Sequence, residues 1–201
     1  MNLINNVYDL DGVTGEEIGV KGAYGYWFES TGKRVVEKLI AYTPAGKELV
    51  FGQQTDCFDF GFGDIDQNSG EIEDKVSSNN GDARKVLETV LSTIPDFFSR
   101  EPAAIVKVGG SDSQTEFTEN CMKECRTKKC LETKECRKKD RRINIYRSFV
   151  NDNYDRLIEE YEFFGSVALD EDDNKYLIEP YEVNKFYKIV LVRKKLIKFE
   201  A

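Results

Sequence analysis

The stretch Asp82–Val108, DARKVLETVLSTIPDFFSREPAAIVKV, joins a helical pattern to a short apolar run. Apolar residues recur every three or four positions over 82–99, which is the spacing of a helix with one buried face. The polar segment 79–82 supplies a helix start, and Pro95 is expected to kink or shorten the last turn. Residues 103–108 have the composition of a buried strand. The stretch therefore predicts a helix followed directly by a strand.

Short apolar runs broken by Gly and Pro lie on the N-terminal side of this stretch. Three of them are rich in aromatic and β-branched residues, which favour strands: 23–31, 34–43 and 47–62. The turn residues between the second and third runs are Pro44-Ala45-Gly46. A fourth short strand is expected around Gly70–Ser77. This half of the chain predicts an antiparallel meander.

Helical spacing returns on the C-terminal side, from Arg142 to Tyr161, and an interruption is expected at Asn151–Asn153. Three strands are expected after it, over 161–167, 174–181 and 186–198. The order of elements predicts an α+β fold: an antiparallel meander followed by helix-strand-helix-strands, as a mixed sheet with helices packed on it. We expect a single domain over 1–201.

The composition excludes several classes of active site. The 201 residues include 29 Lys and Arg, 37 Asp and Glu, and no histidine, for a net charge of −8. A chain without histidine has no Ser-His-Asp triad, no Cys-His nucleophile and no HExxH zinc site. The N-terminal residues lack the pattern of a signal peptide, and no apolar run is long enough to span a bilayer. We therefore expect a cytoplasmic protein with reduced thiols and no membrane contact.

A basic, cysteine-rich insertion is expected over 113–140. Four of the five cysteines fall within 16 consecutive residues, namely Cys121, Cys125, Cys130 and Cys136. Four thiolates can hold a structural zinc ion, and nearby Lys and Arg would lower the pKa of these thiols. The spacing contains no CxxC pair. Free thiols and disulfides are therefore alternatives to structural zinc, and sequence alone does not separate the three.

The same segment dominates the charge pattern. Residues 121–142 carry a net charge of +6, so the remainder of the chain carries −14. A local basic segment on an acidic body favours contact with an acidic partner. We interpret the protein as a binding module whose insertion recognises a protein or an acidic ligand. Nucleic acid is a partner only through residues 121–142.

Two groups of residues are candidates for binding an anion. The first is the helix start at Asn80 and Gly81, where backbone N–H groups and the helix dipole favour a phosphate. The alternative is that Asn80 or Asp82 simply caps the helix. The second group contains Gly110, Ser111, Arg142, Tyr146 and Arg147. The guanidinium groups of its two arginines can clamp a phosphate or carboxylate. The alternative is that these arginines pair with acidic residues and brace the sheet.

Convergence of the two groups on one pocket would indicate an enzyme, either a transferase resembling acyltransferases or a nuclease-like toxin. The order of strands and helices resembles the N-acetyltransferase fold, whose pyrophosphate-binding loop would correspond to 79–83. That fold's loop is normally richer in glycine than this segment. The enzyme hypothesis is therefore the alternative to the binding module.

Several motifs resemble those of a bacterial family of uncharacterised small proteins. They are, in order, Phe62-Gly63-Asp64, Ser78-Asn79-Asn80-Gly81-Asp82 with Lys85–Val90 (KVLETV), Gly109-Gly110-Ser111, and Arg141–Arg147 (RRINIYR). The resemblance spans residues 25–167 and implies a domain of unknown function. It carries no activity that can be transferred to this chain. The insertion before Arg141 is a departure from the shorter members of that family.

Overall fold

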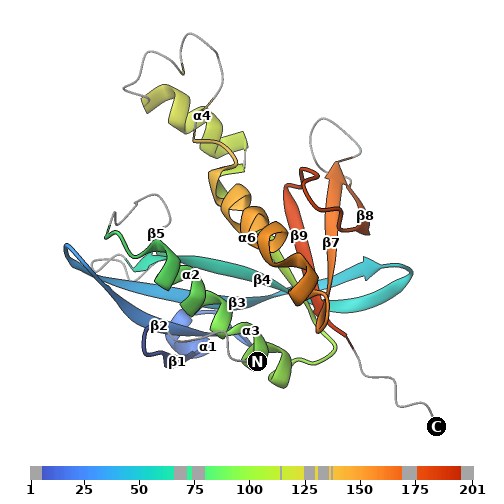
Figure 1. The fold of residues 1–201 in the computed structure, drawn as a ribbon, viewed down its shortest axis with the longest axis horizontal. Helices are drawn as coiled ribbons and strands as arrows, with labels where there is room; N and C mark the ends of the chain where they lie inside the picture. The colour runs from blue at the N-terminus through green and yellow to red at the C-terminus, as the bar shows by residue number, and fades with distance from the viewer. Residues whose placement is uncertain are drawn as a thin grey trace. The chain divides into compact units, whose positions relative to one another are not determined.

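The computed structural model describes residues 6–65, 72–73, 80–113, 115–124, 130, 136, 138–168 and 176–195 (Figure 1). The chain divides into two compact units. The first contains residues 1–49, 53–106 and 196–201, and the second contains 50–52 and 107–195. Each unit is described separately below, and the expectation of a single domain over 1–201 stays a prediction.

The first unit is built on the meander that the sequence predicts. Its strands neighbour one another in chain order, and β5 pairs with β4. The pairs β1–β2, β2–β3 and β4–β5 are antiparallel. The strands are β1 (Asp11–Thr14), β2 (Tyr24–Thr31), β3 (Val35–Val50), β4 (Gln53–Ile65) and β5 (Ile72–Glu73).

The expected turn at Pro44-Ala45-Gly46 is wrong. β3 runs on to Val50, and the chain reverses at Phe51 and Gly52, both of which have positive φ. Pro44 lacks a backbone N–H, which normally ends a central strand. The pairing with β2 stops at Tyr42, so Pro44 interrupts no hydrogen bond on that side of β3. A proline beyond the end of the neighbouring strand therefore does not end β3.

Two helices, α2 (Ala83–Ser92) and α3 (Ile94–Arg100), replace one continuous helix, because Pro95 occupies the first turn of α3. Phe97 and Phe98 of α3 are fully buried. The Phe97 ring centroid lies 4.6 Å from that of Tyr42 on β3, which fixes α3 against the sheet. The prediction that Pro95 kinks or shortens the helix is confirmed, as a division between α2 and α3 at Thr93. β1 and the one-turn helix α1 (Gly15–Ile18) carry too few apolar residues for the pattern to reveal them.

The second unit contains the long helix α6 (Arg141–Leu157) and three strands in the order β9-β7-β8. The strands are β7 (Tyr161–Ala168), β8 (Tyr176–Pro180) and β9 (Ile189–Lys194), and both of their pairings are antiparallel. The asparagines at 151–153 do not interrupt α6. Asn153 bonds back to the Phe149 carbonyl at 2.8 Å, and Asn151 accepts the Tyr181 hydroxyl at 2.8 Å. Their side chains therefore have partners without breaking the helix.

Three further elements lie between α3 and α6 in the chain. Strand β6 (Ile105–Gly109) begins in the first unit and ends in the second. A 3-10 turn, η1 (Ser111–Ser113), follows it, and helix α4 (Thr115–Glu124) begins the predicted insertion. The strand predicted over 103–108 is confirmed as β6, and the second predicted helix is confirmed as α6.

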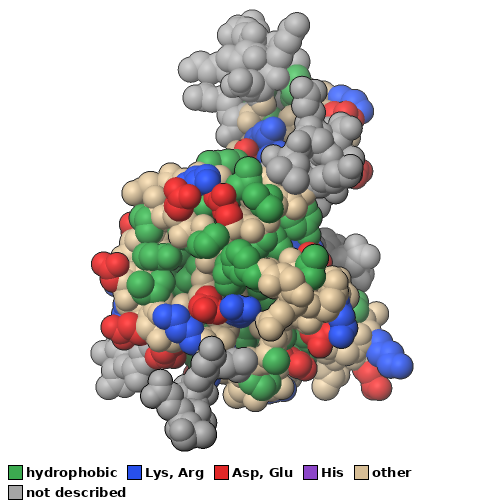
Figure 2. All heavy atoms as spheres, turned by 90° about the vertical axis from the view of Figure 1, so that its right-hand side faces the viewer, with side chains coloured by type: hydrophobic (Ala, Val, Ile, Leu, Met, Phe, Trp, Pro, Cys, Tyr) green, Lys and Arg blue, Asp and Glu red, His purple; other side chains and the backbone are tan. Residues whose placement is uncertain are grey.

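One close contact in the second unit depends on a glycine. The ring of Tyr187, which is fully buried, lies against Gly165 of β7, where any side chain would collide with it. Exposed large hydrophobic side chains also occur in this unit, at Phe51, Ile145, Leu177, Val183 and Phe186. Surface hydrophobic groups interspersed with charged ones are visible in Figure 2.

The fold class predicted from the order of elements, α+β with helices packed on strands, is confirmed. Among the described residues, no helix is both long and apolar enough to cross a membrane.

Candidate functional site

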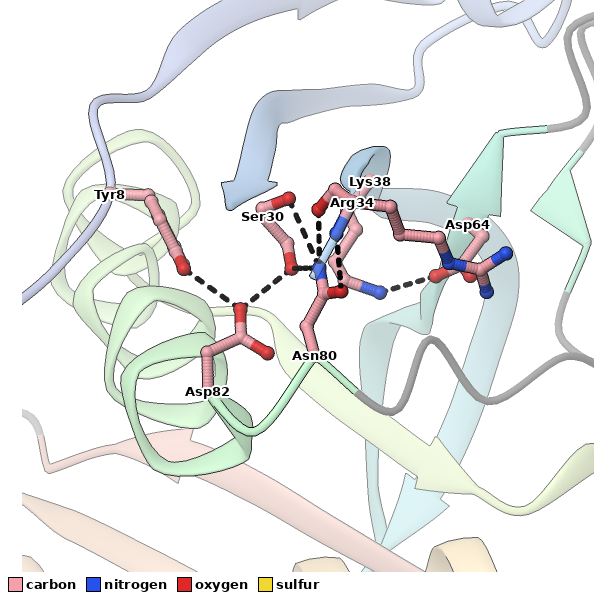
Figure 3. Close-up of polar contacts among 7 residues, drawn as sticks. All are labelled: Tyr8, Ser30, Arg34, Lys38, Asp64, Asn80 and Asp82. Carbon is pink, nitrogen blue, oxygen red and sulfur yellow. Dashed lines mark hydrogen bonds and ion pairs between the residues drawn. The ribbon is translucent and has the colours of Figure 1, made fainter. Parts of the chain in front are cut away.

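Asn80 holds the turn between β2 and β3 in the first unit (Figure 3). Its side-chain nitrogen donates to the Ser30 Oγ at 3.0 Å and to the Arg34 carbonyl at 2.9 Å, and its side-chain oxygen accepts the Arg34 N–H at 3.3 Å. Gly32 in this turn approaches Asn80 so closely that a Cβ would lie 2.5 Å from the Asn80 carbonyl oxygen. Asn80 therefore uses its amide to fix its own chain, and does so without capping α2.

Asp82 continues this network towards the N-terminal segment. Its Oδ2 accepts the Ser30 hydroxyl at 2.6 Å and the Tyr8 hydroxyl at 2.8 Å (Figure 3). Burial alone would raise the pKa of Asp82, but the hydrogen bonds from Ser30 and Tyr8 outweigh it and lower the pKa below its ordinary value. Asp82 stands at the N-cap position of α2 and makes no side-chain capping bond. We call Tyr8, Ser30, Arg34, Asn80 and Asp82 the Asn80–Asp82 network.

A buried ion pair lies beside this network. The Lys38 ammonium on β3 bonds the Asp64 carboxylate on β4, and their side chains are 6% and 13% exposed. Lys38 also lies over the Phe62 ring, 5.7 Å from its centroid. Its charge contributes to lowering the pKa of Asp82. A positive charge thus lies buried between a carboxylate and an aromatic ring in the first unit.

Acid is expected to remove the contribution of Asp82 to stability. Because its folded pKa lies below the unfolded value of about 3.9, the ionised form stabilises the fold above that value, and this stabilisation is lost as the pH falls through the folded pKa. Urea unfolding of Asp82→Asn should therefore differ from wild type more at pH 6 than at pH 3. The matched control is Asp9→Asn, at an exposed position. A difference from wild type that is equal at both pH values contradicts the assignment.

The first predicted anion-binding group, Asn80 and Gly81, belongs entirely to the first unit. Gly81 is exposed with a φ of 81°, next to the ionised carboxylate of Asp82. A carboxylate at a helix N-terminus competes with a bound anion for the same positive potential. The geometry favours the structural alternative for Asn80, and ligand binding there stays a prediction.

The second predicted group lies in the second unit, where Asp112 connects η1 to the start of α6. The buried Asp112 accepts the backbone N–H of Arg142 at 3.1 Å, and the Arg142 guanidinium donates to the Ser111 Oγ at 2.8 Å. Burial raises the pKa of Asp112, while the backbone N–H groups of Arg142 and Arg141 oppose the rise. The structure thus brings Ser111 and Arg142 together. It does so by using Asp112 to cap a helix whose own N-cap residue, Asp140, makes no capping bond.

Gly110 and Arg147 also serve packing. A Cβ on Gly110 would lie 2.7 Å from the Asp112 Oδ1, so a glycine is needed for this close approach. Arg147 is buried, donates to the Asn144 Oδ1 at 2.9 Å and bonds the Lys185 carbonyl. Its guanidinium lies 4.7 Å from the centroid of the Phe186 ring. Arg147 therefore fixes the loop before β9, and the expected pairing of this arginine with a carboxylate does not occur among the described residues.

Tyr146 is partly exposed, one residue before Arg147 on α6. The enzyme hypothesis needs the group around Arg142, Tyr146 and Arg147 to meet Asn80 and Gly81. Because the two groups belong to different units, that hypothesis stays a prediction.

The cysteine cluster is described only in part. Cys130 and Cys136 are buried, Cys121 on α4 is partly exposed, and Cys125 lies outside the described residues. Within the described part of the chain, no group of three or more acidic, cysteine or histidine side chains is arranged to hold a metal ion. The predicted four-thiolate site includes Cys125, so a structural zinc ion stays a prediction.

Sequence reasoning missed Tyr8, Ser30, Lys38 and Asp64 as a connected set. One signal was available for Lys38, because alternation along β3 places it on the same face as the buried Ile40 and Tyr42. A lysine on the buried face of a strand needs a partner, which predicts an acidic residue on a neighbouring strand. Nothing in the local pattern indicates Tyr8, whose hydrogen bonds to Asp82 and Thr89 each span more than 70 residues of chain.

Residues 20–118 match the model of a family described as a family of unknown function (DUF6934). No curated protein and no solved structure matches the chain. The match confirms the predicted resemblance to a family of unknown function for this part of the chain. It ends before the C-terminal limit of the predicted span 25–167, so Arg141–Arg147 lies outside it. The family motifs and a bacterial origin stay predictions.

Proposed function

We propose that this protein is a binding module that recognises an acidic protein surface through the basic residues at the start of α6. The observation that carries the proposal is a run of cations, Lys138, Lys139 and Arg141, all of which are exposed. Among the described residues, none of these three side chains forms a salt bridge or a hydrogen bond. A cation that no carboxylate neutralises keeps its full electrostatic attraction for a binding molecule.

The charge distribution supports an acidic partner that binds in one orientation. The segment 121–142 carries +6 and the remainder of the chain −14, so an acidic partner is attracted locally and repelled elsewhere. Such an arrangement steers the approach of the partner and suppresses binding to other faces.

An apolar side chain beside the cations favours protein over nucleic acid. Ile145 is 49% exposed and follows Arg141 by four residues, so the two share one face of α6. Protein interfaces combine charged residues at the rim with apolar groups at the centre. Affinity for nucleic acid, in contrast, depends on neutralising many phosphates, whereas the surface at the start of α6 is defined by three exposed cations.

Charge reversal tests the proposal. The triple variant Lys138→Glu, Lys139→Glu, Arg141→Glu is expected to weaken binding of a fluorescent poly-glutamate peptide on the order of tenfold or more at low salt, because attraction becomes repulsion. The readout is fluorescence anisotropy, and binding by wild type should weaken as ionic strength rises.

The matched control reverses three exposed cations of the first unit, with the variant Lys21→Glu, Lys33→Glu, Arg84→Glu. It changes the net charge by the same amount and is expected to retain most of the binding. Equal losses in both variants would show that only the net charge matters. If wild type bound a single-stranded oligonucleotide more tightly than poly-glutamate, the partner would be nucleic acid and not an acidic protein.

A structural zinc ion held by Cys121, Cys125, Cys130 and Cys136 is a separate proposal for the insertion. Burial of Cys130 and Cys136 supports a structural role for these thiols. We expect one zinc per chain by elemental analysis, lost in Cys136→Ser and retained in Cys57→Ser, which replaces a buried cysteine of β4. Five titratable thiols without metal would indicate free cysteines, and fewer thiols without metal would indicate disulfides.

A further inference from the structure

The N-terminal segment, residues 6–10, is attached to the first unit mainly through one residue, Tyr8. Tyr8 is 8% exposed, whereas its neighbours Asn6 and Asp9 are exposed and Val7 and Leu10 are only partly buried. The segment has no strand or helix of its own and precedes β1. The segment is therefore held in the same way as a bound peptide that is anchored by one residue.

The ring and the hydroxyl of Tyr8 both have partners on β2, on α2 or at the N-cap of α2. Its ring stacks on Phe28 with centroids 5.4 Å apart, and the Lys85 ammonium lies 3.7 Å from the ring centroid. Its hydroxyl donates to the Asp82 Oδ2 at 2.8 Å and accepts the Thr31 N–H at 3.2 Å. The ring contacts suit any aromatic residue, but the hydroxyl contacts require a phenol.

The backbone of the segment is also recognised. The N–H of Tyr8 donates to the Thr89 Oγ1 of α2 at 2.9 Å, in a buried contact. This bond orients the main chain, while the phenol contacts select the side chain. A main-chain bond combined with a side-chain site is how extended peptides are generally bound.

The walls of this site are held in place without Tyr8. Asp82 is fixed by the Ser30 hydroxyl at 2.6 Å, and Thr89 donates its own hydroxyl to the Lys85 carbonyl at 2.8 Å. Phe28 stacks on Phe62 with centroids 6.4 Å apart. These contacts are made by β2, β4, α2 and the N-cap residue of α2, so none of them depends on Tyr8.

We propose that β2 and α2 form a binding site for an extended segment bearing a tyrosine, and that residues 6–10 of this chain occupy it. The walls, Phe28, Thr31, Asp82, Lys85 and Thr89, all lie within the family match over 20–118, while Tyr8 lies outside it. The site is thus part of the family domain, and its occupant is an addition to that domain. Release of the segment opens the site to a tyrosine-bearing segment of another chain.

The test removes the Tyr8 side chain from the site and supplies the N-terminal segment as a separate peptide. A fluorescein-labelled peptide of residues 4–11, INNVYDLD, is titrated into Tyr8→Ala and into wild type, with anisotropy as the readout. The variant should bind it at least tenfold more tightly than wild type, whose own segment competes. The same peptide with alanine in place of tyrosine should bind the variant at least tenfold more weakly, and one with phenylalanine should be intermediate.

Equal binding to wild type and variant, or binding independent of the tyrosine, overturns the proposal. So does a Tyr8→Ala variant that remains unfolded in the presence of the peptide, because Tyr8 is then an integral part of the core. Hydrogen exchange of wild type gives a second test that needs no variant. The amides of residues 8–10 should exchange at least a hundredfold faster than those of β2 and β3, and exchange at the same rate would contradict a separable segment.

Discussion

Replacing Lys38 by methionine is expected to lower the free energy of unfolding by about 3–5 kcal/mol, because it leaves the buried carboxylate of Asp64 without its counter-charge. Methionine fills the space of the lysine stem, so lost packing contributes little to this effect. The side chains of the pair are only 6% and 13% exposed, so water cannot replace the ammonium group. Urea unfolding at pH 7 measures the loss.

Two controls separate this explanation from a general effect of removing lysine. Lys47→Met removes a partner of Asp56 in a pair whose side chains are 60% and 67% exposed, and should change the stability by less than about 1 kcal/mol. The double variant Lys38→Met, Asp64→Leu should recover most of the stability lost in the single variant, because neither charge remains buried. A single variant as stable as wild type would show that Asp64 is solvated.

Replacing Gly165 by alanine is expected to destabilise the second unit by about 3 kcal/mol, at the upper end of the usual cost of overpacking. The added Cβ would lie 2.1 Å from the Cδ1 of Tyr187, far inside van der Waals contact. Neither partner moves easily. β7 pairs with β8 on one side and β9 on the other, and the Tyr187 hydroxyl donates to Glu179 at 2.8 Å. Thermal unfolding monitored by circular dichroism measures the loss.

The control for Gly165 is Gly12→Ala on β1, where a Cβ meets nothing within 4 Å and stability should stay nearly unchanged. In a Tyr187→Ala background, the additional cost of Gly165→Ala should fall well below its cost in wild type, since the colliding ring is gone. Additive losses in the double variant would place the origin of the effect in the backbone of β7 instead.

Periodicity identified most of the elements of the fold, because their buried faces are long. The apolar spacing before and after Pro95 marked α2 and α3, and the β-branched run at 103–108 marked β6. Local composition failed to predict the end of a strand where that end depends on the neighbouring strand. The length of β3 depends on where β2 stops pairing, and a rule that places a turn at Pro44 does not contain that information.

The candidate sites were harder to predict for the same reason. Asn80 and Arg142 were singled out as ligand-binding groups, yet their side chains bond groups 31 to 50 residues away in the chain. A polar residue beside a glycine looks the same in sequence whether it faces a ligand or the turn of a distant hairpin. Only Lys38 carried a local indication, because it shares one face of β3 with the buried Ile40 and Tyr42.

The capping of α6 by Asp112 has a consequence for the length of the segment between them. The contacts of Asp112 and Ser111 with Arg142 join the two ends of the intervening segment, so its length is decoupled from the geometry on either side. Doubling the length of a flexible loop costs only about 0.6 kcal/mol of closure entropy. Segments of different length can therefore be accommodated at this position while the residues on either side keep their contacts.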